Sequence, residues 1–301
     1  MKFVCMILML LFSMISVAFL TLLERKVLGY IQFRKGPNKV GVIGLFQPFS
    51  DAVKLFTKEF LFPLKSNFYP YWLSPMLTLF ISLIIWLVFP YWYMILSWKY
   101  SFIFMFVIMS LGVYGIMMSG WSSNSSYSIL GCLRVVAQSI SYEVSFLLLV
   151  LSVMYFSNTL SIGILMYLQS NIWFFFIFFP VFLMVFVSFL AELNRTPFDF
   201  SEGESELVSG FNIEYGGSGF AFIFLGEYLS IIFSSFFLVI MFFGSLSFHF
   251  YFYLKIIFFS FLIILIRGVL PRYRYDKLMI LCWKSFLSSI LLLLIFYSLI
   301  I

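Results

Sequence analysis

Three acidic residues lie inside apolar stretches of the sequence, where little water is available to stabilise a charge. They are Glu143, Glu192 and Glu227. A charged side chain at the centre of a membrane costs about 2.5–3.5 kcal/mol on insertion scales, so each acid is expected to face other helices rather than lipid. Desolvation favours the protonated carboxyl group, and acids at stepped depths could pass protons through intervening water. The pattern favours a proton path, and buried ion pairs, for instance Glu192 with Arg195, are the alternative.

More acids follow Glu192 directly. Six of the chain's 12 acidic residues lie in the segment 190–217, and Arg195 is the single base there. Glu202 and Glu206 would repel each other on a helix, which favours protonation of one of them or a cationic partner. Large apolar residues alternate with the acids, so we expect a folded, docked element that ends in the flexible stretch YGGSG; a solvated loop is the alternative. The acids after Glu192 are Asp199, Glu202, Glu204, Glu206 and Glu214.

Several kinds of site are excluded by the residue types that are scarce. His249 is the only histidine, which argues against histidine-based metal sites and Ser-His-Asp catalysis. The three cysteines stand far apart, at positions 5, 132 and 282, without the paired spacing that zinc or iron–sulfur clusters need. No glycine-rich phosphate loop follows a predicted strand. We therefore expect this chain to bind no metal and no redox cofactor.

Helices that cross a membrane must position these acids. The chain has 301 residues, of which 63% are hydrophobic and 10% charged, and its mean hydropathy is +1.11, far outside the range of soluble domains. Apolar runs of about 20 residues recur along its length. The prediction is an all-α, polytopic membrane protein with a single membrane domain over 1–301. Eight helices are expected, near 3–23, 69–91, 99–120, 135–156, 172–192, 218–243, 253–271 and 278–300.

Basic residues are concentrated in the loops after the first, third, fifth and seventh predicted helices. The opposite side keeps little beyond Lys2, Lys99 and Lys255. Lysine and arginine are enriched on the cytoplasmic or matrix side of membranes, so both termini are predicted to lie on the other side. The basic set comprises Arg25, Lys26, Arg34, Lys35, Lys39, Lys54, Lys58, Lys65, Arg134, Arg195, Arg272, Arg274 and Lys277.

The long loop 24–68 on the basic side contains an amphipathic pattern. At 100° per residue its apolar and charged residues separate onto opposite faces, which predicts an interfacial helix lying along the membrane. A surface helix that merely anchors the loop is the alternative. The apolar face holds Phe49, Val53, Phe56 and Phe60, and the charged face holds Asp51, Lys54 and Lys58.

Four stretches resemble a known family. They are LLERKVLGYIQFRKGPNKVG (22–41), QPFSDAVKLFTKE (47–59), AELNRTPFDFSEGESELVSGFNIEY (191–215) and RGVLPRYRYDKLM (267–279). Nearly end to end, the chain resembles the family of subunit 1 of NADH:ubiquinone oxidoreductase, respiratory complex I, in its mitochondrial form. The resemblance implies a subunit of a proton-translocating enzyme, multi-pass in the mitochondrial inner membrane. Both termini would face the intermembrane space, and the loop 24–68 and the acidic loop 193–217 would face the matrix.

The resemblance also implies roles for individual residues. Family members form the heel of the membrane arm and help to enclose a tunnel through which the substrate, ubiquinone, approaches an iron–sulfur cluster of a neighbouring subunit. The tunnel residues would be Glu24, Arg25, Arg34, Asp51, Glu59, Phe220, Phe224 and Arg274. The proton path would comprise Glu143, Glu192, Glu202, Glu204, Glu206 and Glu227. Partner subunits of the peripheral and membrane arms would hold the iron–sulfur clusters and FMN, and membrane lipids but no nucleic acid would also be partners.

Three other functions compete with this interpretation. The membrane anchor of a related membrane-bound hydrogenase would share the helical framework and some of the acids. A proton-coupled transporter working alone would use the same acids, but it would be expected to show internal repeats or interrupted helices around a midplane site. A passive assembly scaffold would be recognised by loss of the complex, rather than loss of coupling, when the acids are changed.

Overall fold

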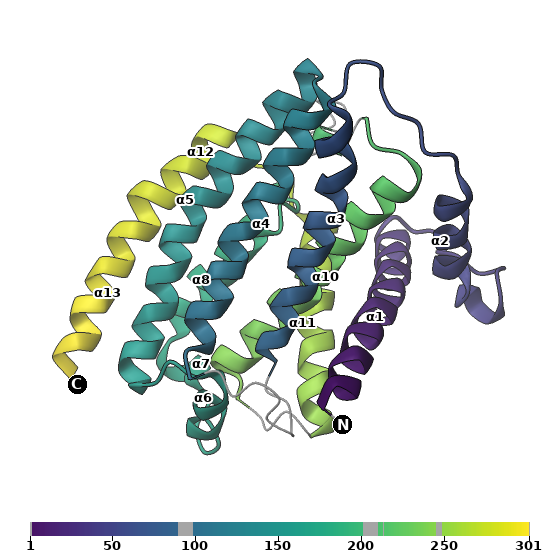
Figure 1. Ribbon diagram of the computed structural model, residues 1–301. Coiled ribbons are helices and arrows are strands. Elements are labelled where there is room, and N and C mark those ends of the chain that lie inside the picture. The colour runs from purple at the N-terminus through teal and green to yellow at the C-terminus, as the bar shows by residue number, and fades with distance from the viewer. Residues whose placement is uncertain (1, 90–98, 201–209, 213, 245–248, 301) are drawn as a thin grey trace.

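The computed structural model describes residues 2–89, 99–200, 210–212, 214–244 and 249–300. These residues form helices joined by turns and loops, without a strand in the described ranges, which confirms the predicted all-α class. Figure 1 shows most of the long helices running side by side in one bundle. The α-helices are α1 (Lys2–Ile31), α2 (Gln47–Thr57), α3 (Phe68–Ile84), α4 (Ser101–Ser123), α5 (Ser126–Ser157), α6 (Ile162–Leu168), α7 (Phe174–Ile177), α8 (Phe179–Glu192), α10 (Gly217–Phe242), α11 (Phe250–Val269), α12 (Tyr275–Ile280) and α13 (Leu287–Ile300).

Seven helices in the described part of the chain are long and apolar enough to cross a membrane. A 3₁₀ turn, Ile85–Val88, extends α3, and a π-helical segment, Leu281–Phe286, joins α12 to α13 into one span. The seven match seven of the eight predicted spans, and together they make the chain a multi-pass membrane protein. The spans are Phe3–Ile31, Phe68–Val88, Ser101–Ser123, Ser126–Ser157, Gly217–Phe242, Phe250–Val269 and Tyr275–Leu299.

The helix expected over 172–192 is divided in two. Phe178 has non-helical angles, φ −110° and ψ 33°, and separates α7 from α8. Pro180 stands in the first turn of α8. Its ring lacks an N–H and would collide with the preceding turn of a continuous helix, so the helix starts again at this point. The apolar helix α8 that remains has only 14 residues.

Two helices also extend beyond their predicted boundaries. The first helix was expected to end at residue 23, but α1 continues to Ile31 and places Glu24 and Arg25 on its last turns. The fourth was expected to begin at 135, but α5 begins at Ser126 and includes Arg134. Glutamate and arginine are good helix formers, so a helix can continue past the first charges, where an apolar run stops.

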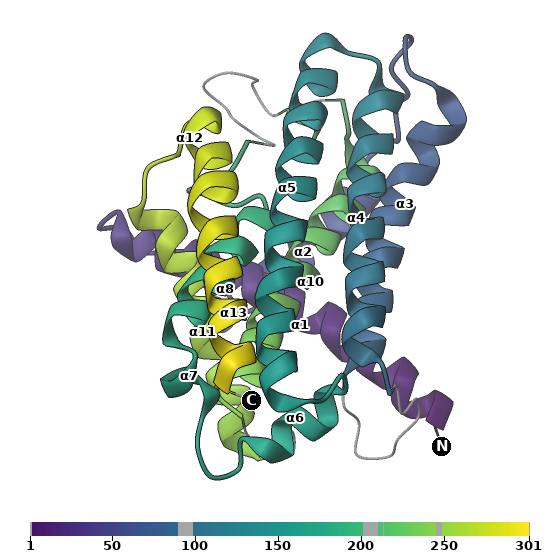
Figure 2. The ribbon, with the colours of Figure 1, turned by 90° about the vertical axis from the view of Figure 1, so that its left-hand side faces the viewer.

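The helix α10 lies at the centre of the bundle. It is apolar on all sides, as expected of a fully buried helix, and it packs against α3, α11, α1 and α2. Of its most apolar 18 residues 72% are buried, against 17% for the spans at the two ends of the chain. Figure 2 shows α3, α4, α5 and the α12–α13 helix side by side along one face. A charged residue on α10 is therefore in the interior of the protein.

The predicted amphipathic helix exists as α2. Its apolar residues contact the bundle: the Phe49 ring lies 6.1 Å from that of Phe19 in α1, and the Phe56 ring lies 5.8 Å from that of Phe222 in α10. Phe60, which was assigned to the same face, lies beyond the end of the helix at Thr57 and contacts another ring. No residue of α2 is fully buried.

Candidate functional site

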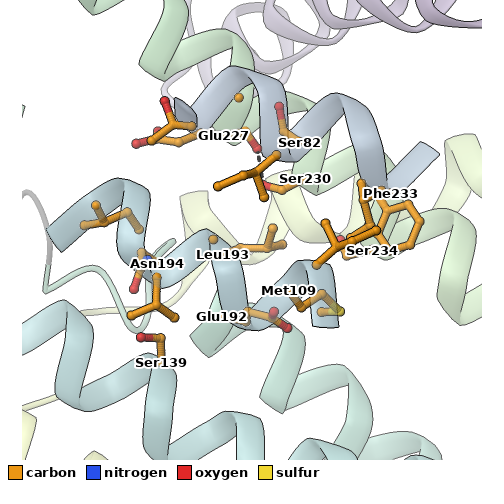
Figure 3. A pocket seen from close by; sticks show the side chains of 18 of the residues that line it. Ser82, Met109, Ser139, Glu192, Leu193, Asn194, Glu227, Ser230, Phe233 and Ser234 are labelled. Carbon is orange, nitrogen blue, oxygen red and sulfur yellow. Dashed lines mark hydrogen bonds between the residues drawn. The ribbon is translucent and has the colours of Figure 1, made fainter. Parts of the chain in front are cut away.

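The three acids predicted inside the spans line one cavity. Its volume is about 170 Å³, and residues of α3, α4, α5, α8 and α10 surround it. Glu143 comes from α5, Glu192 from the end of α8 and Glu227 from α10. Figure 3 shows Glu192 and Glu227 reaching this space from two different helices. A water molecule occupies about 30 Å³ in the liquid, so several could fit beside the carboxyl groups.

Hydroxyl and amide groups add hydrogen-bonding capacity to this cavity. The polar residues other than the acids are Thr78, Ser82, Ser139, Asn194, Ser230 and Ser234. Most of the remaining lining is apolar. Water in such a place can bind to the polar groups and to the carboxyl groups. Water in this cavity can therefore bridge the carboxyl groups that line it.

A buried amide on α5 fixes the end of α8. Gln138 is fully buried, and its Nε2 donates to the carbonyl of Ala191 at 2.7 Å and to that of Phe198 at 3.1 Å. Asn194 then takes a left-handed conformation, with φ 50°, and turns the chain away from the helix axis. These bonds hold Glu192, which follows Ala191, against the cavity. The sequence analysis did not select Gln138, although an amide inside an apolar run was a usable signal.

Arg195 reaches from this turn to the central helix. It is 7% exposed, and its Nη2 lies 3.5 Å from the Oε2 of Glu227. Its guanidinium group also lies over the ring of Tyr228, 4.8 Å from the ring centre. The sequence had suggested Glu192 as the partner of Arg195, three residues away. The structure instead shows a contact across the bundle, because the turn at Asn194 points the arginine towards α10.

Tyr228 continues the polar contacts towards α1. Its hydroxyl donates to the Oε2 of Glu24 at 2.6 Å. Arg267, near the end of α11, forms an ion pair with the other carboxylate oxygen of Glu24. Glu24 is only 5% exposed, so the two donors compensate a buried charge. Glu24, Tyr228, Arg195 and Glu227 thus form one chain of contacts that ends at the cavity.

Arg25 points the other way from Glu24 and binds α2. Its Nη1 lies 2.5 Å from the Oδ2 of Asp51, and the Nε2 of Gln47 donates to the Oδ1 of the same carboxylate at 3.1 Å. The arginine and aspartate side chains are 52% and 33% exposed. This half-exposed pair ties α2 to the last turns of α1. Two adjacent residues, Glu24 and Arg25, therefore connect α1 to different neighbours.

The other predicted tunnel residues divide into two groups. Phe220 and Phe224 pack against each other along α10 with ring centres 4.3 Å apart, and the second ring lies 6.0 Å from that of Tyr228, so they continue the Glu24 cluster towards the start of α10. Arg34 and Glu59 are exposed and make no ion pair among the described residues. Arg274 pairs with Asp276 at 2.9 Å, and both side chains are largely exposed. The structure does not bring these last residues into the cluster around Glu24.

Three acids of the predicted proton path, Glu202, Glu204 and Glu206, lie outside the described residues. On the near side of this segment Asp199 is buried and pairs with Arg272 at 3.4 Å. Phe198 and Phe200 are buried as well, as expected of a docked segment. The part of the acidic segment that precedes residue 201 is thus packed onto the protein.

The far side of the acidic segment is anchored by two tyrosines. The Tyr215 hydroxyl lies 2.9 Å from the Oγ of Ser74 and 3.0 Å from that of Ser122, and its ring stacks on Tyr71 at 4.4 Å. Burial raises the pKa of Tyr215, which keeps its hydroxyl protonated. The glycines that follow were expected to be flexible. From Gly217, which has φ +57°, they instead form the first turn of α10.

No group of three or more histidine, cysteine, aspartate or glutamate side chains in the described ranges is arranged to hold a metal ion. The available chemistry is that of carboxyl groups, tyrosine hydroxyls and guanidinium groups. Such groups can bind a polar ligand and exchange protons with water.

Comparison with known proteins relates this arrangement to one family. A family model described as NADH dehydrogenase matches residues 4–298. The chain is 57% identical to NADH-ubiquinone oxidoreductase chain 1 of Anopheles gambiae, over 94% of this chain and 90% of that one. It is 54% identical to the protein of the same name from Locusta migratoria, over 94% and 90%. It is 48% identical to that of Apis mellifera ligustica, over 97% and 95%.

Proposed function

This chain belongs to the NADH dehydrogenase family, and from that premise we propose that it is a core membrane subunit of the proton-pumping NADH:ubiquinone oxidoreductase, complex I, of the mitochondrial inner membrane. In this role it helps to form the ubiquinone tunnel and couples quinone reduction to proton movement. The observation that carries the coupling is the continuous set of polar contacts from Glu24 to the acid-lined cavity.

The tunnel would lie where α1, α2 and the first turns of α10 meet. Ubiquinone has a polar head and an apolar tail, and this region offers both kinds of contact. Phe220 and Phe224 provide an aromatic surface next to the charged Glu24 cluster. Val53 of α2 is 63% exposed and adds apolar surface. The aromatic rings would contact the tail, and the charged cluster would interact with the head.

Coupling would begin with the charge of the reduced quinone. Reduction of ubiquinone to ubiquinol takes up two electrons, supplied by a partner subunit's iron–sulfur cluster, and two protons. Negative charge that develops before protonation attracts the guanidinium groups of Arg25 and Arg267, which now neutralise Asp51 and Glu24. A weakened Arg267 pair makes protonation of Glu24 more favourable. The hydrogen bond that the Tyr228 hydroxyl donates to Glu24 would then weaken, because a neutral carboxyl group is a weaker acceptor than a carboxylate, and the tyrosine would be freer to reorient.

A reoriented Tyr228 would change the charge balance at the cavity. Arg195 lies over the Tyr228 ring and pairs with Glu227, so a displaced ring changes how well the arginine neutralises Glu227. A less neutralised Glu227 takes up a proton more readily. Water in the cavity can then exchange protons among Glu227, Glu143 and Glu192. The energy of quinone reduction would thus appear as a change in proton affinity inside the bundle.

The coupling role is tested by removing the charge of the cavity acids while keeping their shape. Glu192→Gln or Glu143→Gln in the intact complex should lower quinone-linked proton pumping by about 10²-fold, the lower range for a positioned proton-transfer group, and leave the assembled complex in normal amount. Asp276→Asn is the matched control, because Asp276 is exposed and outside the cavity. Normal pumping by assembled Glu192→Gln and Glu143→Gln complexes would exclude the cavity from the coupling mechanism.

The tunnel is tested separately with a photoreactive ubiquinone analogue on native membranes. Labelling within residues 24–60 or 210–225 that excess ubiquinone suppresses is the expected result. If quinone reductase activity is intact and only another subunit is labelled, this chain does not line the tunnel.

A further inference from the structure

Lys284 is a charged residue in an apolar span. It belongs to the π-helical segment Leu281–Phe286 within the membrane span Tyr275–Leu299. The joined helix α12–α13 runs along the edge of the bundle in Figure 1 and lies beside α5 in Figure 2. The Lys284 side chain is exposed rather than turned into the bundle. A lysine ammonium in this position faces what surrounds the protein within the membrane.

Contacts on the opposite side of the same helix give the depth of Lys284. Cys282 lies against α5, where its Sγ is 3.2 Å from the carbonyl oxygen of Ser141 and 3.8 Å from the Oγ of Ser145. Those two residues flank Glu143, so Lys284, two residues beyond Cys282, lies at about the level of that acid. At about 100° per residue, two residues bring a side chain to the other side of a helix.

The ammonium group has no acidic partner in the part of the chain that the structure describes. A charge inside the membrane is costly unless it is paired or reaches water. The side chain could reach the basic side of the membrane only by extending over the nine positions that separate it from Tyr275, about 13 Å of helix. A stem of four methylene groups is too short for that distance. The charge must therefore be compensated near its own depth.

The surface around Lys284 suits another helix. Ser285 and Ser288 are exposed next to it, and small residues allow two helices to approach closely in a membrane. Their hydroxyls donate to carbonyls of their own helix, of Leu281 at 2.5 Å and of Lys284 at 2.6 Å, so they need no partner from outside. Trp283 is 52% exposed and adds a large apolar contact.

We propose that Lys284 marks a docking surface for a transmembrane helix of another subunit, which carries an aspartate or glutamate at the depth of Lys284. This inference rests on the proposed function, because it requires a multi-subunit assembly. The docking surface consists of Trp283, Lys284, Ser285 and Ser288. It lies on the opposite side of the α12–α13 helix from α5, so docking here leaves the cavity intact.

A zero-length cross-link tests this inference on the native complex. A membrane-permeant carbodiimide adds to a carboxyl group in apolar surroundings to form an O-acylisourea. A contacting neutral amine then attacks the acyl carbon, which forms an amide and releases the carbodiimide as a urea. We expect mass spectrometry to find the peptide that contains Lys284 joined to an acidic residue inside a predicted span of another subunit. If Lys284 is instead modified by a water-soluble amine reagent as readily as Lys277, which is exposed at the start of α12, the proposal is wrong.

Variants provide an independent readout. Lys284→Met should lower the amount of assembled complex several-fold, since the partner's carboxylate would lose its counter-charge, and Lys284→Arg should restore most of it. Lys277→Met is the matched control and should assemble normally. Assembly of Lys284→Met at the normal level would overturn the proposal, as would protection of Lys284 that disappears when lipid is removed from an otherwise intact complex, because lipid headgroups would then be the partner.

The two proposals can fail separately. Absence of the chain from particles with NADH:ubiquinone reductase activity would reject the proposed function. A chain that is present in active particles, without the Lys284 cross-link and without an assembly defect in Lys284→Met, would reject the docking surface alone.

Discussion

Tyr228 is the residue through which the Glu24 cluster and the cavity communicate. Its hydroxyl binds Glu24, and its ring lies under the guanidinium group of Arg195, which pairs with Glu227. One side chain thus touches both an acid near the proposed tunnel and the arginine that neutralises a cavity acid. Neither contact involves neighbours in sequence: Glu24 and Tyr228 are 204 positions apart.

Tyr228→Phe is therefore expected to separate the two clusters. The phenylalanine keeps the ring under Arg195 but removes the donor to Glu24, and a hydrogen bond to a charged group contributes about 1.5–3 kcal/mol. Quinone-linked turnover should fall by about tenfold or more while the complex still assembles. Tyr297→Phe is the control, because Tyr297 is also buried but its hydroxyl makes no hydrogen bond to another described residue. Equal activities of the two variants would contradict this role for Tyr228.

The sequence was informative about single acids but not about their partners. Glu143, Glu192 and Glu227 could be selected because an acid in an apolar run is rarely tolerated without a reason. The pairing of Arg195 with Glu227 could not be predicted, since it depends on the left-handed turn at Asn194 and on the packing of α8 against α10. The same holds for Arg267, which lies within a stretch that carries the family resemblance but whose partner, Glu24, is 243 positions away.

At the scale of elements, two buried glutamines hold helix ends in place. Gln138 binds the carbonyls of Ala191 and Phe198 beside the cavity. Gln169 does the same at the other end of the bundle: its Nε2 donates to the carbonyls of Ile240 and Met241, and its Oε1 accepts from the N–H of Gly244. The two residues thus have similar structural tasks at opposite ends of the molecule.

Exchanging each glutamine for leucine separates stability from coupling. Both Gln138→Leu and Gln169→Leu leave buried backbone groups without partners, at about 1–3 kcal/mol for each unsatisfied group, so both should lower the melting temperature of the complex. Only Gln138→Leu should also lower the ratio of protons pumped to quinone reduced, because it alone loosens the turn that carries Glu192 and Arg195. A similar ratio in both variants would show that the turn beside the cavity tolerates movement.

Helix positions were predictable where length and apolar character determine them. The seven long spans were found from the sequence because about 20 apolar residues are needed to cross the membrane. The break at Phe178 was missed, since residues 172–192 form one apolar run and the effect of Pro180 is local. α2 was predicted because its apolar residues recur with helical period, but its end at Thr57 was not. The π-helical segment around Lys284 has no sequence pattern that would have indicated it.

At the scale of the whole molecule, the distribution of lysines predicts which side each loop faces. Lys99 precedes α4 on the poorly charged side, and Lys39 lies in the basic loop between α1 and α2; both are exposed. In mitochondria whose outer membrane has been ruptured, a membrane-impermeant amine reagent should label Lys99 and spare Lys39. Inverted inner-membrane vesicles should give the reverse result, and detergent-solubilised protein should be labelled at both positions. Labelling of Lys39 in the ruptured mitochondria would reverse the proposed orientation.

The family and the membrane architecture can be predicted from the sequence more completely than the contacts inside the bundle. The motifs that carry the resemblance are spread from residue 22 to residue 279. The family model matches a longer range, from residue 4 to residue 298, which includes all of these motifs. Interior contacts depend on how helices that are far apart in sequence pack together. From the sequence, Glu143, Glu192 and Glu227 could be placed only at separate depths. The packing of the helices brings all three acids to one cavity.

The short helix α8 has a consequence for the electric field across the membrane. Fourteen residues at about 1.5 Å each cover roughly 21 Å, less than the hydrocarbon thickness of about 30 Å. α8 alone therefore covers only part of the layer over which the transmembrane voltage falls. A unit charge that crosses the full voltage exchanges about 2.3 kcal/mol per 100 mV. In the proposed coupling, a proton that moves along the membrane normal among the cavity acids would therefore exchange only part of this energy with the transmembrane voltage.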